Sequence, residues 1–189
     1  MIRGLVLLNS GNIEDYLPDL YEWSHTETEK EQHTCRPISE LPPYNNYKEN
    51  VLKRLENGLL IYILVDRTNT NKRIGKIQLF DYNSRNKSAE IGYYLPLRHR
   101  KQGYANVVLE LFLNTMFERK DLELNKIYAT VAACNQTSIK LLEKFHFKLE
   151  GTYREHYWFS DGSICNQYHY SLLKREYVSL SEKKIEAIE

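Results

Sequence analysis

The stretch YYLPLRHRKQGYA, residues 93–105, joins an apolar segment to an amphipathic one through a basic turn. Residues 89–95 before the turn are typical of a strand, and the apolar spacing of residues 107–113 after it is typical of a helix. The first turn of a helix has unpaired N–H groups and the positive end of the helix dipole, so it binds phosphate well. Gly103 allows the backbone to approach an anion closely. This order of segments predicts a pyrophosphate site in the turn.

The spacing of the turn fits neither of the two common nucleotide loops, because the chain contains no G-x-x-x-x-G-K-[ST] and no G-x-G-x-x-G. Residues 100–105 instead fit [RQ]-x-x-G-x-[GA], which resembles the acetyl-coenzyme A loop of the GNAT superfamily of N-acetyltransferases. A surface turn with a solvated basic patch is the alternative interpretation. The resemblance implies that the following residues bind the cofactor: Tyr94, Leu95, Arg98, Arg100, Lys101, Gln102, Gly103, Tyr104 and Ala105.

A second segment extends the resemblance beyond the loop. Residues 135–147 fit N-x-x-[AS]-I-x-x-x-x-K-x-x-F, and residues 150–154 fit E-G-x-x-R. This order is similar to the GNAT branch that contains the N-terminal acetyltransferases of ribosomal proteins, as are AEIGYYL before the loop and YSLLKREY near the end. The resemblance covers residues 74–177 and is poor over residues 1–58, where such enzymes usually contact their substrates.

The segment pattern predicts an α/β fold with one GNAT-like sheet. We expect a single mixed, mostly antiparallel sheet of about seven strands, with helices on both faces and a splay between the fourth and fifth strands. Residues 1–175 are expected to form a single acetyltransferase domain, followed by a charged tail, residues 176–189, that is either helical or frayed. Strands are predicted at residues 2–8, 59–66, 73–82, 88–95, 126–132, 148–159 and 164–173. Helices are predicted at residues 13–23, 47–56, 104–119 and 137–145. A loop is predicted at residues 24–46, for which a short helix is the alternative.

Acetyl transfer from a thioester to an amine needs a base for the amine, a donor for the oxyanion and a proton for the departing thiolate. Glu90 is the candidate base, directly or through water, and a structural carboxylate paired with an arginine is the alternative. Asn135 either binds the pantetheine arm or caps the following helix, and both roles are compatible. Ser138 either assists the thiolate or is merely solvated.

One departure from the family pattern bears on the thiolate. Many relatives carry tyrosine, as the proton donor, at the position that Leu142 occupies here. That role therefore cannot be transferred to this chain, and a water held by Ser138 is the substitute we expect.

The net charge and the cysteines of the chain indicate which partners and which cellular compartment to expect. The net charge is +1 over 189 residues, which gives no indication of nucleic-acid binding. The three cysteines, Cys35, Cys134 and Cys165, have neither a disulfide-framework nor a zinc spacing, and they fit a reducing cytoplasm. We therefore expect a cytoplasmic protein with no metal, no membrane association and no nucleic-acid partner, as a monomer or homodimer.

These observations together predict an acetyl-CoA-dependent N-acetyltransferase that acts by direct transfer in a ternary complex. The branch resemblance implies a protein N-terminal amine as acceptor. A small-molecule amine, such as a polyamine or an aminoglycoside, is the alternative, for which Asp15, Asp19 and the acidic residues between 27 and 31 could supply an acidic groove. A CoA-binding module without turnover is the second alternative, because Leu142 replaces the expected tyrosine.

Overall fold

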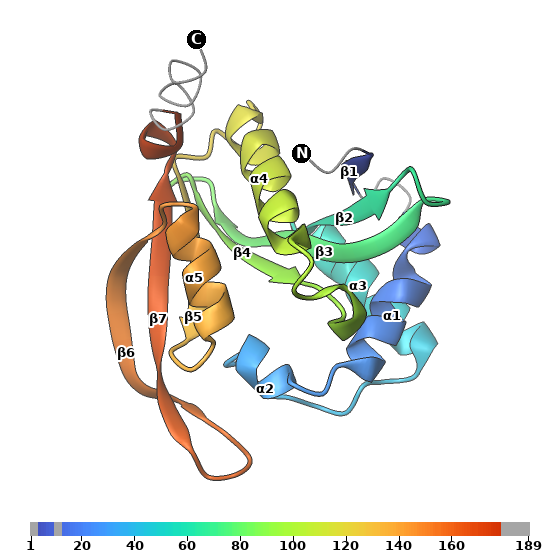
Figure 1. The fold of residues 1–189 in the computed structure, drawn as a ribbon, viewed down its shortest axis with the longest axis horizontal. Helices are drawn as coiled ribbons and strands as arrows, with labels where there is room; N and C mark the ends of the chain where they lie inside the picture. The colour runs from blue at the N-terminus through green and yellow to red at the C-terminus, as the bar shows by residue number, and fades with distance from the viewer. Residues whose placement is uncertain (1–3, 10–12, 179–189) are drawn as a thin grey trace. The chain divides into compact units, whose positions relative to one another are not determined.

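The computed structural model describes residues 4–9 and 13–178. Its strands form one seven-stranded sheet within these residues, in the order β1-β2-β3-β4-β5-β7-β6. The strands are β1 (Leu5–Asn9), β2 (Leu60–Asp66), β3 (Lys72–Asn83), β4 (Ser88–Tyr94), β5 (Lys126–Ala132), β6 (Lys148–Trp158) and β7 (Ile164–Leu173). The α-helices are α1 (Leu17–Thr26), α2 (Lys30–His33), α3 (Tyr44–Glu56), α4 (Tyr104–Glu118) and α5 (Gln136–Lys144), and the short 3-10 helices are η1 (Ile13–Asp15) and η2 (Leu97–His99). Figure 1 labels the helices and strands.

The sheet is mixed, as the sequence predicts. β4 and β5 pair in parallel, whereas β1 with β2, β2 with β3, β5 with β7, and β6 with β7 pair antiparallel. The parallel pairing runs from Ser88 opposite Lys126 to Glu90 opposite Tyr128 and ends there. β5 remains paired with β7 as far as Ala132. This early end of the parallel pairing is what a splay between the fourth and fifth strands requires.

Backbone contacts divide the chain into two compact units. The first, which we call the amino-terminal unit, comprises residues 1–30, 36–81 and 91–114. The second, the carboxy-terminal unit, comprises residues 31–35, 82–90 and 115–189. The assignment of residues 1–175 to a single domain stays a prediction.

The core of the amino-terminal unit forms around β2, whose five central residues are all buried. A strand buried on both faces requires a continuous apolar run, and LIYILV supplies it. Leu17, Leu20 and Trp23 of α1 and Val51 of α3 pack against this strand. The core therefore supports both the end of α1 and β4, whose Tyr94 packs at its margin.

The predicted helix at residues 13–23 is displaced in the structure. η1 covers Ile13–Asp15, and α1 then begins at Leu17 and continues to Thr26, with Pro18 in its first turn rather than in its middle. Proline is tolerated there because the N–H that it lacks would have no helical partner. Residues 24–46 contain the short helix α2, which is the alternative considered for this segment, and the predicted loop is wrong at its ends, where α1 ends and α3 begins.

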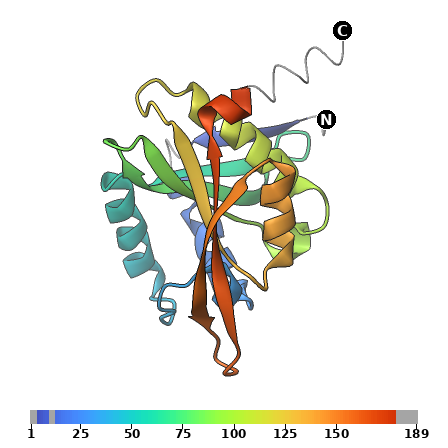
Figure 2. The same ribbon diagram turned by 90° about the vertical axis from the view of Figure 1, so that its left-hand side faces the viewer.

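In the carboxy-terminal unit, α5 lies alongside the β6–β7 hairpin in both Figure 1 and Figure 2. The hairpin turns at Asp161 and Gly162, with Gly162 at φ +82° and the Asp161 carboxylate accepting from the N–H of Ser163. Residues 174–178 are helical, and residues 179–189 of the predicted tail lie outside the described residues.

Candidate functional site

The backbone of the loop between β4 and α4 contains residues in left-handed conformations. After β4, Leu95 and Pro96 lead into η2 (Leu97–His99). The chain then adopts left-handed conformations at Lys101 (φ +59°) and Gly103 (φ +83°) before α4 begins at Tyr104. Glycine adopts this conformation without strain. The Asn106 N–H donates to the Gly103 carbonyl at 3.0 Å, which closes the first turn of α4.

This path leaves a run of backbone donors without partners. In the part of the chain that the structure describes, none of the N–H groups of residues 101–105 donates a hydrogen bond to another group. A Cβ atom placed on Gly103 would meet no atom of the described residues within 4 Å apart from its chain neighbours, so the space in front of this glycine is open. Because N–H groups without partners at a helix start attract anions, the loop has the backbone features of a phosphate cradle.

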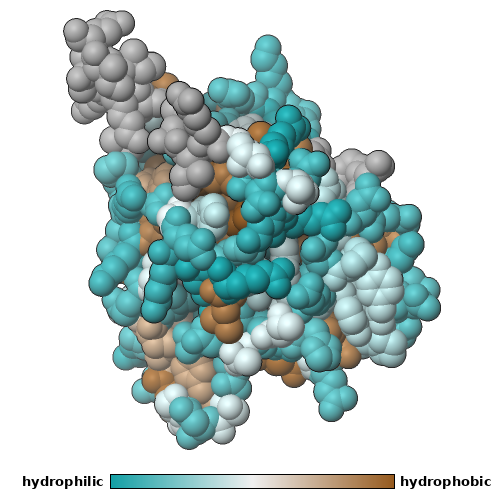
Figure 3. Space-filling view, turned by 45° about the vertical axis from the view of Figure 1, so that its right-hand side comes forward, coloured by the Kyte–Doolittle hydropathy of each residue, from teal (hydrophilic) through white to brown (hydrophobic). Residues whose placement is uncertain are grey.

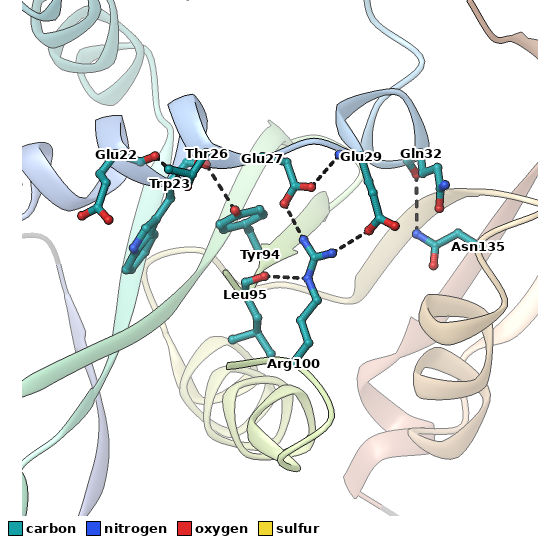
Figure 4. Close-up of polar contacts among 10 residues, drawn as sticks. All are labelled: Glu22, Trp23, Thr26, Glu27, Glu29, Gln32, Tyr94, Leu95, Arg100 and Asn135. Carbon is teal, nitrogen blue, oxygen red and sulfur yellow. Dashed lines mark hydrogen bonds and ion pairs between the residues drawn. The ribbon is translucent and has the colours of Figure 1, made fainter. Parts of the chain in front are cut away.

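Arg100 begins the loop motif, and the structure commits its guanidinium to other groups of the amino-terminal unit (Figure 4). Its Nε donates to the Leu95 carbonyl at 2.9 Å, and Nη1 donates to Glu29 Oε2 at 2.6 Å. Nη2 pairs with Glu27, whose side chain is 5% exposed. Arg100, which the sequence analysis predicted to bind the cofactor, is thus paired with two carboxylates of the chain. These contacts connect the loop to the residues that follow α1.

The remaining predicted loop residues divide into supporting and exposed groups. The Tyr94 hydroxyl donates to the Trp23 carbonyl at 3.2 Å, and burial together with the nearby Glu27 carboxylate raises the pKa of Tyr94. Arg98 pairs with Glu22 at 3.3 Å, and Gln102 Nε2 donates to the Arg98 carbonyl at 2.7 Å.

Lys101 differs from Arg98 and Arg100 in its surroundings. Its side chain is exposed and makes no ion pair among the described residues. Ala105 and Tyr104 stand in the first turn of α4, where their N–H groups belong to the run without partners.

His99 is a supporting residue that sequence reasoning missed. It is 2% exposed, and its ring packs edge-on against Tyr104 at 6.0 Å between centroids. Burial, and then the positive charges of Lys72 and Arg98, lower the pKa of His99. Its Nε2 accepts a hydrogen bond from Arg98 Nε at 3.3 Å. In the sequence, only the position of His99 within the loop indicated a role for this residue.

Asn135 caps α5 in the carboxy-terminal unit, which confirms one of the two roles predicted for it. Its Oδ1 accepts from the N–H of Ser138 at 3.1 Å, and its Nδ2 donates to the Gln32 carbonyl at 3.5 Å (Figure 4). The hydroxyl of Ser138 has no hydrogen-bond partner among the described residues. Leu142 is 1% exposed, so the position at which relatives carry tyrosine is part of the core here.

Glu90 is paired with a threonine rather than with an arginine. Thr130 Oγ1 on β5 donates to Glu90 Oε1 at 2.6 Å, and Glu90 itself is half-buried. One carboxylate oxygen is therefore fixed by a neutral donor. The alternative of a carboxylate paired with an arginine does not describe its contact in the structure.

Most of the acidic residues considered for a polycation groove contact groups of the chain itself. Asp19 pairs with Arg73, and Glu27 and Glu29 share Arg100. Glu31 accepts from the N–H and hydroxyl of Ser160 on the β6–β7 hairpin. Much of their charge is thus balanced within the chain.

Polar residues are common on the surface of the protein. On the face drawn in Figure 3, hydrophilic residues predominate and hydrophobic ones form separate small patches. A search of the described residues finds no helix that is long and apolar enough to cross a membrane.

Comparison with known proteins gives a family match and several relatives. A family model described as an acetyltransferase (GNAT) domain matches residues 7–148. An uncharacterized N-acetyltransferase, p20 of Bacillus licheniformis, is 37% identical over 108 residues, which are 57% of this chain and 59% of that protein. The "Putative ribosomal N-acetyltransferase YdaF" of Bacillus subtilis (strain 168) is 31% identical over 126 residues, 64% of this chain and 62% of that protein. The matched regions span 59% and 62% of the lengths of these two relatives.

Solved structures share the fold over nearly the whole chain. A spermidine N-acetyltransferase from Vibrio cholerae, determined in complex with CoA and spermine, superimposes with a TM-score of 0.78 at 22% identity, covering 93% of this chain and 98% of the other. A dodecameric structure of spermidine N-acetyltransferase from the same organism superimposes with a TM-score of 0.77 at 21% identity. At this level of identity the likeness establishes the fold alone.

Proposed function

Since this chain belongs to the GNAT acetyltransferase family, we propose that it binds acetyl-CoA and transfers the acetyl group to a primary amine. The transfer is direct: the amine nitrogen forms a bond to the acetyl carbonyl carbon, the carbon–sulfur bond breaks, and CoA leaves as a thiol. One proton leaves the amine and one reaches the sulfur, so the reaction needs no metal or redox partner.

The observation that carries the proposal is the run of N–H groups without partners from residue 101 to residue 105. Five consecutive donors at the start of α4 suit the two phosphates of a pyrophosphate, and the helix dipole favours the same charge. The open space at Gly103 allows the phosphates to approach the backbone. Lys101 adds a positive charge from an exposed side chain.

We assign the proton transfers to residues of the carboxy-terminal unit. Glu90 is the proposed base, and the hydrogen bond from Thr130 leaves one of its carboxylate oxygens for the amine or for a bridging water. Ser138 is the proposed donor to the departing thiolate, directly or through water, because its hydroxyl has no partner among the described residues. Asn135 fixes the start of α5 and thereby the position of Ser138.

The proposed acceptor is a protein N-terminal amine. The resemblance of residues 135–154 to the branch of ribosomal-protein acetyltransferases supports it, and so does the similarity to the Bacillus subtilis relative named as a ribosomal N-acetyltransferase. A polyamine acceptor would need carboxylates that are available to a polycation. Here Asp19, Glu27 and Glu29 are already paired with arginines of the chain.

A thiol-release assay with a panel of amines tests the proposal. Acetyl-CoA is offered together with peptides bearing a free N-terminal amine, with the same peptides blocked at that amine, and with spermidine. We expect CoA thiol to appear with the free peptides and an acetyl group to be found on their N-termini. Release with spermidine alone would overturn the acceptor assignment, and no release above hydrolysis with any amine would overturn the transferase assignment.

A further inference from the structure

The three cysteines of the chain, distant in sequence, all belong to the carboxy-terminal unit. Cys165 Sγ lies 3.6 Å from Cys134 Sγ. Gln167 Nε2 donates to Cys35 Sγ at 3.3 Å, and Gln167 stands two residues beyond Cys165 on the same strand. The proposed acetyl transfer uses none of these thiols.

The backbone brings Cys134 and Cys165 together. β5 and β7 pair antiparallel as far as Ala132 opposite Gln167, and the N–H of Ala133 then donates to the Asn166 carbonyl at 2.8 Å. The next residue after Ala133 is Cys134, in the turn that follows β5, and the residue before Asn166 is Cys165, on β7. Side chains that face each other across an antiparallel pair have Cβ atoms about 4.5–5.5 Å apart. The pairing of β5 with β7 and the hydrogen bond from Ala133 to Asn166 thus bring the backbones of the two cysteines close together.

The two sulfur atoms are close enough to become bonded after small rotations. A disulfide has an S–S distance of about 2.05 Å and a Cα–Cα distance of about 4.4–6.8 Å, which neighbouring antiparallel strands provide. Cys134 is exposed and Cys165 is half-buried, so a small oxidant can reach the pair.

We propose that Cys134 and Cys165 form a dithiol site that a hydroperoxide oxidises to an intramolecular disulfide. One thiolate attacks the peroxide oxygen and becomes a sulfenic acid while the other peroxide oxygen leaves as water or alcohol. The second thiolate then attacks that sulfur, the S–S bond forms, and a second water leaves. The two thiols lose two electrons, and the peroxide gains them. The disulfide joins the residue before the α5 cap to β7, and a thiol reductant reverses it.

The pH dependence of the reaction follows from the surroundings of Cys134. Burial, and then the hydrogen bond and charge of Cys165, raise the pKa of the Cys134 thiol. Tyr157 interacts electrostatically with both thiols of the pair and with Cys35, and burial raises the pKa of Tyr157 as well. Because the thiolate is the reactive form, oxidation should become faster as pH rises above the ordinary range of a cysteine.

Intact-protein mass, thiol titration and disulfide mapping after treatment with hydrogen peroxide test the proposal. We expect the wild-type protein to lose about 2 Da and two of its three thiols, and proteolytic mapping to join Cys134 to Cys165. Cys35→Ser is the matched control, since it removes the third thiol and should still lose about 2 Da. Cys134→Ser and Cys165→Ser should form no intramolecular disulfide under the same treatment, because the sulfenic acid on the remaining cysteine of the pair has no neighbouring thiol to attack it.

Three results would overturn the proposal. The first is retention of all thiols by the folded wild-type protein, and the second is a mapped disulfide that contains Cys35. The third is separate oxidation of the cysteines to sulfinic or sulfonic acids without an S–S bond. Thermal melting before oxidation establishes that each variant is folded, so that a missing disulfide reports on the pair itself.

Discussion

The buried carboxylate of Glu27, directly after α1, pairs with the guanidinium of Arg100 in the loop before α4. The same guanidinium contacts the exposed carboxylate of Glu29 and the Leu95 carbonyl. The ion pair therefore fixes the path of the candidate cofactor loop against a segment that precedes it by more than seventy residues.

Glu27→Gln should destabilise the protein by about 2 kcal/mol, because it leaves a largely buried guanidinium with one charged partner fewer. Glu29→Gln is the matched control, since its side chain is 46% exposed, and it should cost less than about 1 kcal/mol. Urea unfolding of the two variants measures both values. Equal losses would show that burial of Glu27 does not govern the strength of the pair.

Glu90→Gln should lower turnover at pH 7 by about 10²-fold and change the pH profile of the rate, if Glu90 removes the proton of the amine. Thr130→Val removes the hydrogen bond to Glu90 but keeps the carboxylate, so its loss of turnover should be smaller and its profile only shifted. Steady-state rates from pH 6 to pH 9 check this. A wild-type rate and profile for Glu90→Gln would return this residue to a structural role.

Ser138→Ala should slow the chemical step by about tenfold while leaving the affinity for CoA nearly unchanged. The cap of α5 survives this change, because Asn135 accepts from the backbone N–H of Ser138 and not from its hydroxyl. Thr137→Ala, at the exposed neighbouring position, is the control. Single-turnover rates of the two variants and of the wild type measure the chemical step. A wild-type rate for Ser138→Ala would mean that another group donates the proton to the thiolate.

Lys76→Met should stabilise the protein at neutral pH by on the order of 1 kcal/mol. Burial on β3, and then the nearby charge of Arg54, lower the pKa of Lys76 to about 8. The pKa of Lys76 is thus lower in the folded protein than in the unfolded chain, so the charged lysine destabilises the folded protein at every pH below about 8. This destabilisation disappears as the pH rises from about 8 toward 10.5.

The gain from Lys76→Met should therefore shrink over that pH range. Unfolding free energies at pH 7 and pH 10 measure the difference, with Lys140→Met on the exposed face of α5 as the control. A gain that is the same at both pH values would contradict the assigned cause.

The sequence was most informative where local pattern determines structure. The start of α4 and the Asn135 cap each depend on neighbours within a few residues, and both were predicted. The partners of Arg100 were not predicted, because Glu27 and Glu29 lie 73 and 71 residues away in a segment read as loop. The contact of Cys134 with Cys165 likewise depends on the register of β5 and β7, which a single sequence does not specify.

Calorimetric titration of CoA and of pantetheine tests the phosphate cradle most directly, because pantetheine lacks the pyrophosphate. We expect the wild-type protein to bind CoA far more tightly than pantetheine. Gly103→Val, shown by circular dichroism to be folded, should bind CoA at least about 10²-fold more weakly, since the added side chain occupies the open space and strains a backbone at φ +83°. Its affinity for CoA should then approach that for pantetheine. Unchanged CoA affinity in the folded variant, or equal binding of CoA and pantetheine by the wild-type protein, would contradict the assignment of residues 101–105 as the pyrophosphate site.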